Sequence, residues 1–165
     1  MDSATLLFAP PTERWTPLSP RYTPLRRLDT FLGWGFLAIL VAAPVFIFAG
    51  WRWGLGVVGL ALIVISWRLW RQGAIADSWG FAERETDLYI KSGIFFRRLT
   101  VVPYGRMQAV EVAAGPLQRA FKVTTVKLVT ASAASDAVIP GLDPVDAAAL
   151  RDRLTERGET QAAGL

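Results

Sequence analysis

The most constraining feature of the sequence is a run of 20 residues without a charged side chain, Phe31–Gly50. A helix rises 1.5 Å per residue, so this run covers roughly 30 Å, the hydrocarbon thickness of a bilayer. A second apolar segment follows at residues 51–70, with Arg52 and Arg68 near its ends, where long side chains can reach the interface. The two segments predict a transmembrane hairpin with helices at about residues 31–50 and 52–70.

Three other interpretations of these segments are weaker. A soluble helical hairpin needs a polar face for water, and neither segment has one. A cleaved signal peptide begins nearer the N-terminus and has a shorter apolar core, and the second segment leaves no room for a mature N-terminus. Gly54-x-Gly56-x-x-Gly59 has the spacing of a dinucleotide fingerprint, but it lies inside an apolar segment, where small residues allow close helix packing.

Arginine residues flank the two segments unevenly. Those before the first segment are Arg14, Arg21, Arg26 and Arg27, those after the second are Arg68, Arg71 and Arg84, and the turn has Arg52 alone. Positively charged flanks remain in the cytoplasm. We therefore expect a multi-pass protein of the cell membrane whose termini and soluble domain are cytoplasmic.

The sequence contains neither cysteine nor histidine. It therefore lacks thiol nucleophiles, the usual zinc ligands and the side chain most used for proton transfer near neutral pH. Its net charge of +4 is not arranged as the basic, aromatic stripe typical of nucleic-acid binding. Its acidic clusters, near Glu83 and near Asp143, fit a turn and a helix N-terminus. We expect no enzyme activity, no cofactor, no metal ion and no nucleic-acid partner.

After residue 74 the sequence changes to short alternating runs separated by turn residues. Candidate strands lie at residues 88–91, 94–103, 108–112, 124–130 and 137–139. We expect Val110 and Val112 to face inward.

A terminal helix follows these strands. Asp143 is a suitable N-cap, Pro144 suits the first helical position, and Gly158 suits the position after the last turn. The expected apolar stripe is Val145, Ala149, Leu150 and Leu154. An α+β domain is indicated, in which the helix plugs a bent sheet or split barrel. The expected organisation is a proline-rich segment at 1–27, the hairpin at 28–72, the soluble domain at 74–158 and a frayed tail at 159–165.

Several motifs of the soluble part are distinctive. They are IKSGIFFRR at residues 90–98, VPYGRMQAV at 102–110, GPLQRAF at 115–121 and IPGL at 139–142. Over roughly residues 20–155 the sequence resembles the bacterial pleckstrin-homology (PH) domain membrane proteins, the YdbS-like group. The resemblance implies a PH-like split β-barrel, capped by a C-terminal helix and anchored by a transmembrane hairpin. It implies no enzyme activity, and members of the group often occur beside a larger partner with similar domains.

Two positions depart from the pattern of this group. Met107 replaces an isoleucine, which is a conservative apolar change. Lys122 replaces the usual glycine after Phe121, and we expect it to disfavour a backbone with positive φ.

Aromatic and basic side chains between residues 94 and 120 are candidate partner or lipid contacts: Phe95, Phe96, Arg97, Arg98, Tyr104, Arg106 and Arg119. Arginine binds phosphate or carboxylate through two hydrogen bonds, and aromatic side chains with arginine dominate protein interfaces. The alternative is that the arginines are solvated residues of turns and strand edges, with Arg106 satisfying loop backbone groups. We expect one of the two phenylalanines to lie in the core.

Three hypotheses about function follow. The first is a non-catalytic, membrane-anchored binding module in a complex with another membrane protein, such as a larger one of the same family. The second is a sensor or adaptor for anionic lipid of the inner leaflet. It ranks second because residues 84–87, Arg-Glu-Thr-Asp, form an acidic loop that repels a polyanionic headgroup. The third, a transport or channel subunit, is weakest because the apolar segments contain no buried ionisable residue.

Overall fold

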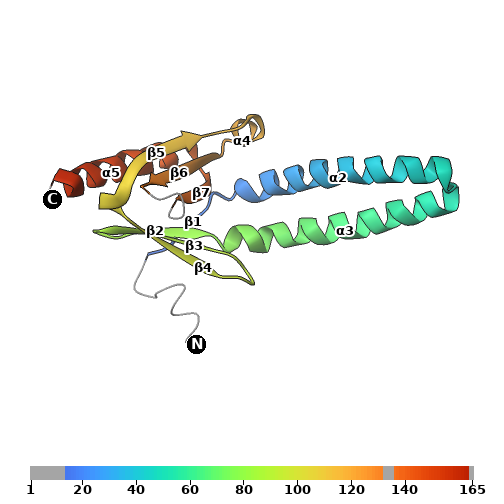
Figure 1. The fold of residues 1–165 in the computed structure, drawn as a ribbon, viewed down its shortest axis with the longest axis horizontal. Helices are drawn as coiled ribbons and strands as arrows, with labels where there is room; N and C mark the ends of the chain where they lie inside the picture. Colours follow the sequence, from blue (N-terminus) through green and yellow to red (C-terminus); the bar gives the residue numbers. More distant parts are fainter. Residues whose placement is uncertain (1–13, 132–135, 164–165) are drawn as a thin grey trace. The chain divides into compact units, whose positions relative to one another are not determined.

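A computed structural model describes residues 14–131 and 136–163 (Figure 1). The chain forms two compact units. One is the helical hairpin, Thr23–Ala74. The other, which we call the β domain, combines the segment up to Tyr22 with the chain from Ile75 onward.

The hairpin consists of helix α2 (Tyr22–Phe48) and helix α3 (Trp51–Asp77), each of 27 residues. Only Ala49 and Gly50 join them, and Gly50 has a φ of 88°. In the most apolar part of each helix, only 6% of α2 and 11% of α3 is buried, whereas a core helix of a soluble protein would be mostly buried. The hairpin therefore presents its apolar side chains outward, as two transmembrane helices do.

Both helices extend beyond the apolar runs. At 1.5 Å per residue each is about 40 Å long, roughly 10 Å more than the hydrocarbon core. Helix α2 begins at Tyr22, within the proline-rich segment expected at 1–27. Pro24 permits this early start because a proline in the first helical turn forfeits no intrahelical hydrogen bond.

The hairpin helices make two kinds of contact with each other. Gly54 packs on the Phe46 ring so closely that a Cβ atom at this glycine would lie 2.5 Å from it. Near the opposite end, the buried Gln72 side chain donates to Thr30 Oγ1 at 2.9 Å and accepts from Arg26 Nε at 3.3 Å. Close packing at one end and hydrogen bonds at the other hold the two helices together.

Two antiparallel sheets form the β domain. The first has the order β1 (Thr16–Pro17), β2 (Gly80–Glu83), β3 (Asp87–Ser92) and β4 (Arg98–Pro103). The second has the order β5 (Met107–Ala113), β6 (Thr124–Thr130) and β7 (Ala137–Leu142). The short helices η1 (Tyr104–Arg106) and α4 (Pro116–Ala120) are connectors, and helix α5 (Pro144–Ala163) follows β7 (Figure 1). This is the expected α+β architecture of strands capped by a C-terminal helix.

The core lies between the two sheets and α5, and its largest fully buried side chains are Tyr104, Leu88, Leu128, Ile139, Leu150, Leu154, Val102, Val123 and Val126. Helix α5 contributes Ala147, Leu150 and Leu154, whose spacing of three and four residues places them on one face. The expectation for Val145 and Ala149 was wrong, because both project from other faces and are exposed. Val112 was also expected inside, but it is 40% exposed.

Helix α5 continues through Gly158 to Ala163. Gly158 is therefore not a terminal cap, and residues 159–163 of the expected tail are helical. Residues 164 and 165 of that tail lie outside the described residues. Gln161 anchors this last turn: its Oε1 accepts the Gly105 N–H at 3.1 Å, and its Nε2 donates to the Glu85 carbonyl at 3.4 Å.

The segment before α2 is part of the β domain. Thr16 and Pro17 pair with Phe81 and Gly80 of β2. Ser19 N–H donates to the Gly141 carbonyl at 2.8 Å, which links this segment to β7 as well. The proline-rich segment expected at 1–27 therefore does not stand apart, because residues 16–19 close the β domain.

Candidate functional site

The turn between β3 and β4, which we call the β3–β4 tip (Ile94–Arg98), exposes two aromatic side chains. Phe95 is 78% exposed and Phe96 is 94% exposed, so the expectation that one of them lies in the core was wrong. Arg97 and Arg98 beside them are also exposed. The tip requires Gly93, whose φ is 96° and whose Cβ position is taken by the Phe96 carbonyl. The tight turn leaves both phenylalanine rings outside the fold.

The tip lies in a basic part of the chain. Between residues 88 and 110 the sequence contains Lys91, Arg97, Arg98 and Arg106 and no acidic residue. Acidic side chains occur on both sides of this stretch, at Asp87 and at Glu111. The exposed aromatic rings therefore lie in a basic stretch of the sequence.

Tyr104 is a structural residue and not a surface contact. Its side chain is fully buried, and its hydroxyl donates to the Arg84 carbonyl at 3.1 Å. Arg157 Nη1 donates to the same hydroxyl at 3.0 Å and to the same carbonyl at 2.8 Å. Burial is the main cause of a raised pKa for Tyr104, and the Arg157 side chain opposes it. Placing Tyr104 among the candidate contacts was wrong.

Glu83 joins α5 to β2 beside this tyrosine. Arg153 donates to its two carboxylate oxygens at 2.7 and 3.2 Å, and Arg157 Nη1 lies 3.6 Å from one of them. The hydrogen bond from Arg153 to Glu83 raises the pKa of Arg153. The sequence predicted an acidic turn at Glu83, and no local signal in it points to this contact with Arg153.

Arg106 and Arg119 are exposed but do not join the tip. Arg106 lies in η1, at the opposite end of the six-residue strand β4, and six residues of strand span about 20 Å. Arg119 lies in α4, a connector of the other sheet. Of the seven candidate residues, the structure brings four together in one place: Phe95, Phe96, Arg97 and Arg98.

Comparison with known proteins is consistent with this architecture. The family model described as "Bacterial PH domain" matches residues 24–158. The chain belongs to this bacterial PH-domain family. A curated relative, "UPF0699 transmembrane protein YdbS" of Bacillus subtilis (strain 168), is 35% identical over 77 residues, which are 47% of each chain. No solved structure matches this PH-domain protein. The resemblance inferred from the motifs is confirmed, and so are the PH-like fold and the membrane assignment.

This PH-domain protein has an open sheet edge at β5. Among the strands that the structure describes, β5 is hydrogen-bonded to β6 alone. Proline and positively charged residues commonly protect such edges from foreign strands. Strand β4 contains Arg98 and Pro103 and β7 contains Pro140, whereas β5 has the sequence MQAVEVA and neither kind of residue.

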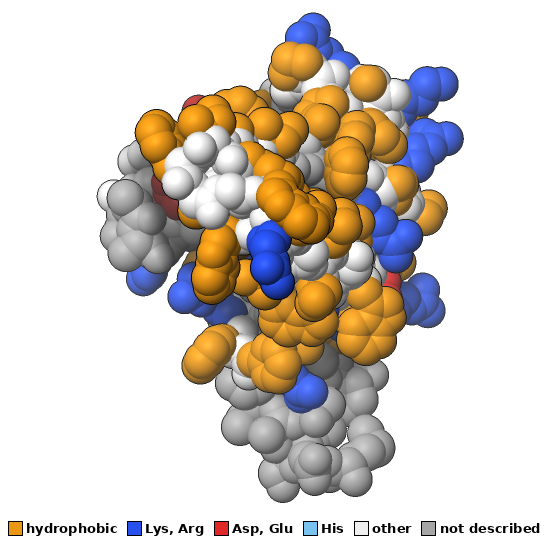
Figure 2. All heavy atoms as spheres, turned by 90° about the vertical axis from the view of Figure 1, so that its right-hand side faces the viewer, with side chains coloured by type: hydrophobic (Ala, Val, Ile, Leu, Met, Phe, Trp, Pro, Cys, Tyr) orange, Lys and Arg blue, Asp and Glu red, His pale blue; other side chains and the backbone are white. Residues whose placement is uncertain are grey.

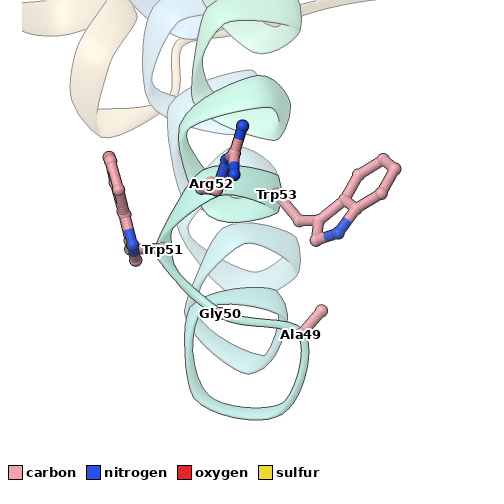
Figure 3. A pocket seen from close by; sticks show the side chains of 5 residues that line it. All are labelled: Ala49, Gly50, Trp51, Arg52 and Trp53. Carbon is pink, nitrogen blue, oxygen red and sulfur yellow. The ribbon is translucent and has the colours of Figure 1, made fainter.

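The hairpin turn of the PH-domain protein carries aromatic side chains. Figure 3 shows Trp51 and Trp53 projecting to opposite sides of the turn, with Arg52 between them around a shallow hollow of about 530 Å³. Tryptophan favours the headgroup level of a bilayer. Figure 2 shows a face of the molecule on which hydrophobic side chains predominate, with basic side chains among them and few acidic ones. The turn thus has the composition of a membrane interface.

Within residues 14–131 and 136–163, no group of three or more acidic, cysteine or histidine side chains is arranged to hold a metal ion.

Proposed function

We propose that this PH-domain protein is a non-catalytic, membrane-anchored binding module and a subunit of a complex with another membrane protein, which adds a β-strand to β5. The observation that carries the proposal is the unprotected outer edge of β5. It is seven residues long, Glu111 is its single charge, and Val112 is 40% exposed. Edge strands of this kind pair readily with other chains, and strand addition is a recurring mode of recognition.

The hairpin favours a partner in the same membrane, because it tethers the β domain, which contains β5, to that membrane. Residues 16–17 and the strands after α3 belong to one folded unit, so both flanks of the hairpin share one side of the membrane. The arginine distribution favours the cytoplasmic side of the cell membrane. The partner is then a membrane protein with a β-strand on that side, such as a larger member of the family.

Co-purification with amide hydrogen exchange tests the proposal. The full chain is purified in mild detergent from its native membrane, and exchange is compared for the complex and the isolated chain. We expect a stoichiometric membrane-protein partner and slower exchange of the amides of residues 107–113 in the complex. The double variant Ala109→Lys, Ala113→Lys places charge on two exposed positions of this edge and should lose the partner.

Val138→Lys is the matched control, because Val138 is 41% exposed on β7, at the other edge of the same sheet. It should retain the partner. The proposal fails if the β5 variant retains the partner, if protection appears elsewhere, or if a second copy of this chain is all that co-purifies.

An anionic-lipid sensor or adaptor of the inner leaflet is the second candidate function, and Arg97 and Arg98 favour it. The acidic turn between β2 and β3 does not favour a lipid sensor, because its polar groups make hydrogen bonds within the β domain. Arg84 donates to the Tyr89 hydroxyl at 3.0 Å, and its carbonyl accepts from Tyr104 and Arg157. Retention of an anionic lipid in place of a protein partner would favour this candidate.

A further inference from the structure

We propose that the β3–β4 tip inserts Phe95 and Phe96 into the boundary between headgroups and acyl chains of the membrane that anchors the protein, while Arg97 and Arg98 bind lipid phosphates. The tip would then be a second membrane attachment, separate from the hairpin. This inference concerns lipid and does not rest on the protein partner proposed for β5.

Connectivity within the β domain places the tip at the end of the first sheet where the chain arrives from α3. The chain leaves α3 at Asp77 and enters β2 at Gly80, which pairs with Lys91 of β3. From Lys91 the chain runs past that pair to Phe96. The tip and the last residues of α3 therefore share one end of the first sheet.

The exposed rings lie beyond the last paired residues of the two strands. Ser92 of β3 pairs with Arg98 of β4, so residues 93–97 form the turn past that pair. Phe95 and Phe96 therefore project from this end of the first sheet.

The chemistry of the tip matches an anionic bilayer surface. Two adjacent phenylalanines, 78% and 94% exposed, present apolar area to water, and its transfer to an apolar phase is favourable. Two arginines follow directly, and arginine binds phosphate through paired hydrogen bonds. Interfacial membrane attachments usually combine aromatic side chains, which lie below the lipid headgroups, with basic side chains, which lie among the headgroups.

Site-specific fluorescence tests the inference. The chain has no cysteine, so Phe96→Cys in the full chain accepts a single environment-sensitive label. The labelled protein is placed in nanodiscs of phosphatidylcholine and phosphatidylglycerol, without any partner. We expect strong quenching by lipids with a nitroxide near the headgroup and weak quenching by aqueous iodide.

Val145→Cys provides the matched control, because Val145 is an apolar residue of α5 that is 76% exposed. A label at position 145 should be quenched weakly by lipid nitroxides and strongly by aqueous iodide. This result excludes insertion that is driven by the label itself. Arg97→Ala with Arg98→Ala should weaken lipid quenching of the Phe96→Cys label in phosphatidylglycerol discs and leave it nearly unchanged in phosphatidylcholine alone.

Two results would overturn the inference. In one, iodide quenches the labels at positions 96 and 145 equally, so the tip is in water. In the other, the label at position 96 is shielded from iodide but not quenched by lipid nitroxides, so the tip is covered by protein. Because the measurement uses the purified chain alone, its failure leaves the proposal for β5 unaffected.

Discussion

Replacing Lys122 with glycine should stabilise the β domain. Lys122 follows α4 with a φ of 54°, the left-handed region that sequence analysis expected lysine to avoid. Its N–H donates to the Arg119 carbonyl at 3.1 Å, and the Val123 N–H donates to the Gln118 carbonyl at 2.8 Å. This pair of hydrogen bonds is the Schellman motif, in which glycine is the preferred residue at the left-handed position. The hydrogen bonds of the helix end therefore impose a backbone that suits lysine poorly.

The magnitude follows from two opposing terms. A side chain in the left-handed region costs roughly 1–2 kcal/mol. Glycine removes this cost but lowers the free energy of unfolding by about 0.5–1 kcal/mol, because an unfolded chain with glycine has more conformational freedom. We expect Lys122→Gly to raise the free energy of unfolding of the β domain by about 0.5–1 kcal/mol.

Amide hydrogen exchange of β6 in detergent measures this change directly, since core strands exchange through the largest openings. A gain of 1 kcal/mol corresponds to roughly fivefold slower exchange, because 1.4 kcal/mol is about tenfold. Lys122→Ala keeps a Cβ atom and should exchange at the wild-type rate. Lys127→Gly, in β6 itself, should exchange faster. Unchanged or faster exchange in Lys122→Gly, or an equal gain in Lys122→Ala, would refute the argument.

Three further predictions concern the fold and the topology. Gly141→Ala should destabilise the β domain by roughly 2–4 kcal/mol, measured by the same amide exchange. Gly141 has a φ of 74°, and a Cβ atom there would lie 2.5 Å from the Tyr22 ring. A smaller effect than that of the same substitution at an exposed glycine, such as Gly105, would contradict this. Burial raises the pKa of Tyr104 above 10.0, so above pH 10 the folded state retains a proton that the unfolded state loses, and the free energy of unfolding should fall as the pH rises. Tyr104→Phe should cost about 1 kcal/mol of stability at neutral pH. In alkaline unfolding curves it should also remove the part of the pH dependence that Tyr104 causes. Reporter fusions at the N-terminus, at Gly50 and at the C-terminus should be cytoplasmic, external and cytoplasmic, and an external terminus would reject the arginine argument.

The hairpin was predictable because lipid imposes a simple requirement: a long run of apolar side chains. The helix ends were not, because residues 22–28 and 71–77 are mixed in polarity and local hydropathy does not distinguish them from loops. Their helical state accompanies tertiary contacts, such as those of Gln72 with Thr30 and Arg26.

The candidate site was predictable only in part. The motif IFFRR showed where aromatic and basic residues gather, but it also suited a strand with one phenylalanine inside. The turn at Gly93 places both phenylalanines outside the core, because it leaves residues 94–97 outside the paired part of β3 and β4. Tyr104 was misassigned because the side chain that donates to its buried hydroxyl, Arg157, is 53 residues away, and local patterns do not contain such contacts.

The pairing of β1 with β2 forms only after the hairpin between them has been synthesised. About 60 residues, including the whole hairpin, lie between Pro17 and Gly80. At about 5–20 residues per second, the ribosome needs roughly 3–12 seconds to synthesise them. During that time residues 16–17 have no strand to pair with, and the hairpin is already available for insertion. Completion of the β domain thus waits for synthesis of the anchor. A chain that inserts just one of the two helices would hold residues 16–17 and β2 on opposite sides of the membrane, and its first sheet would lack the edge strand.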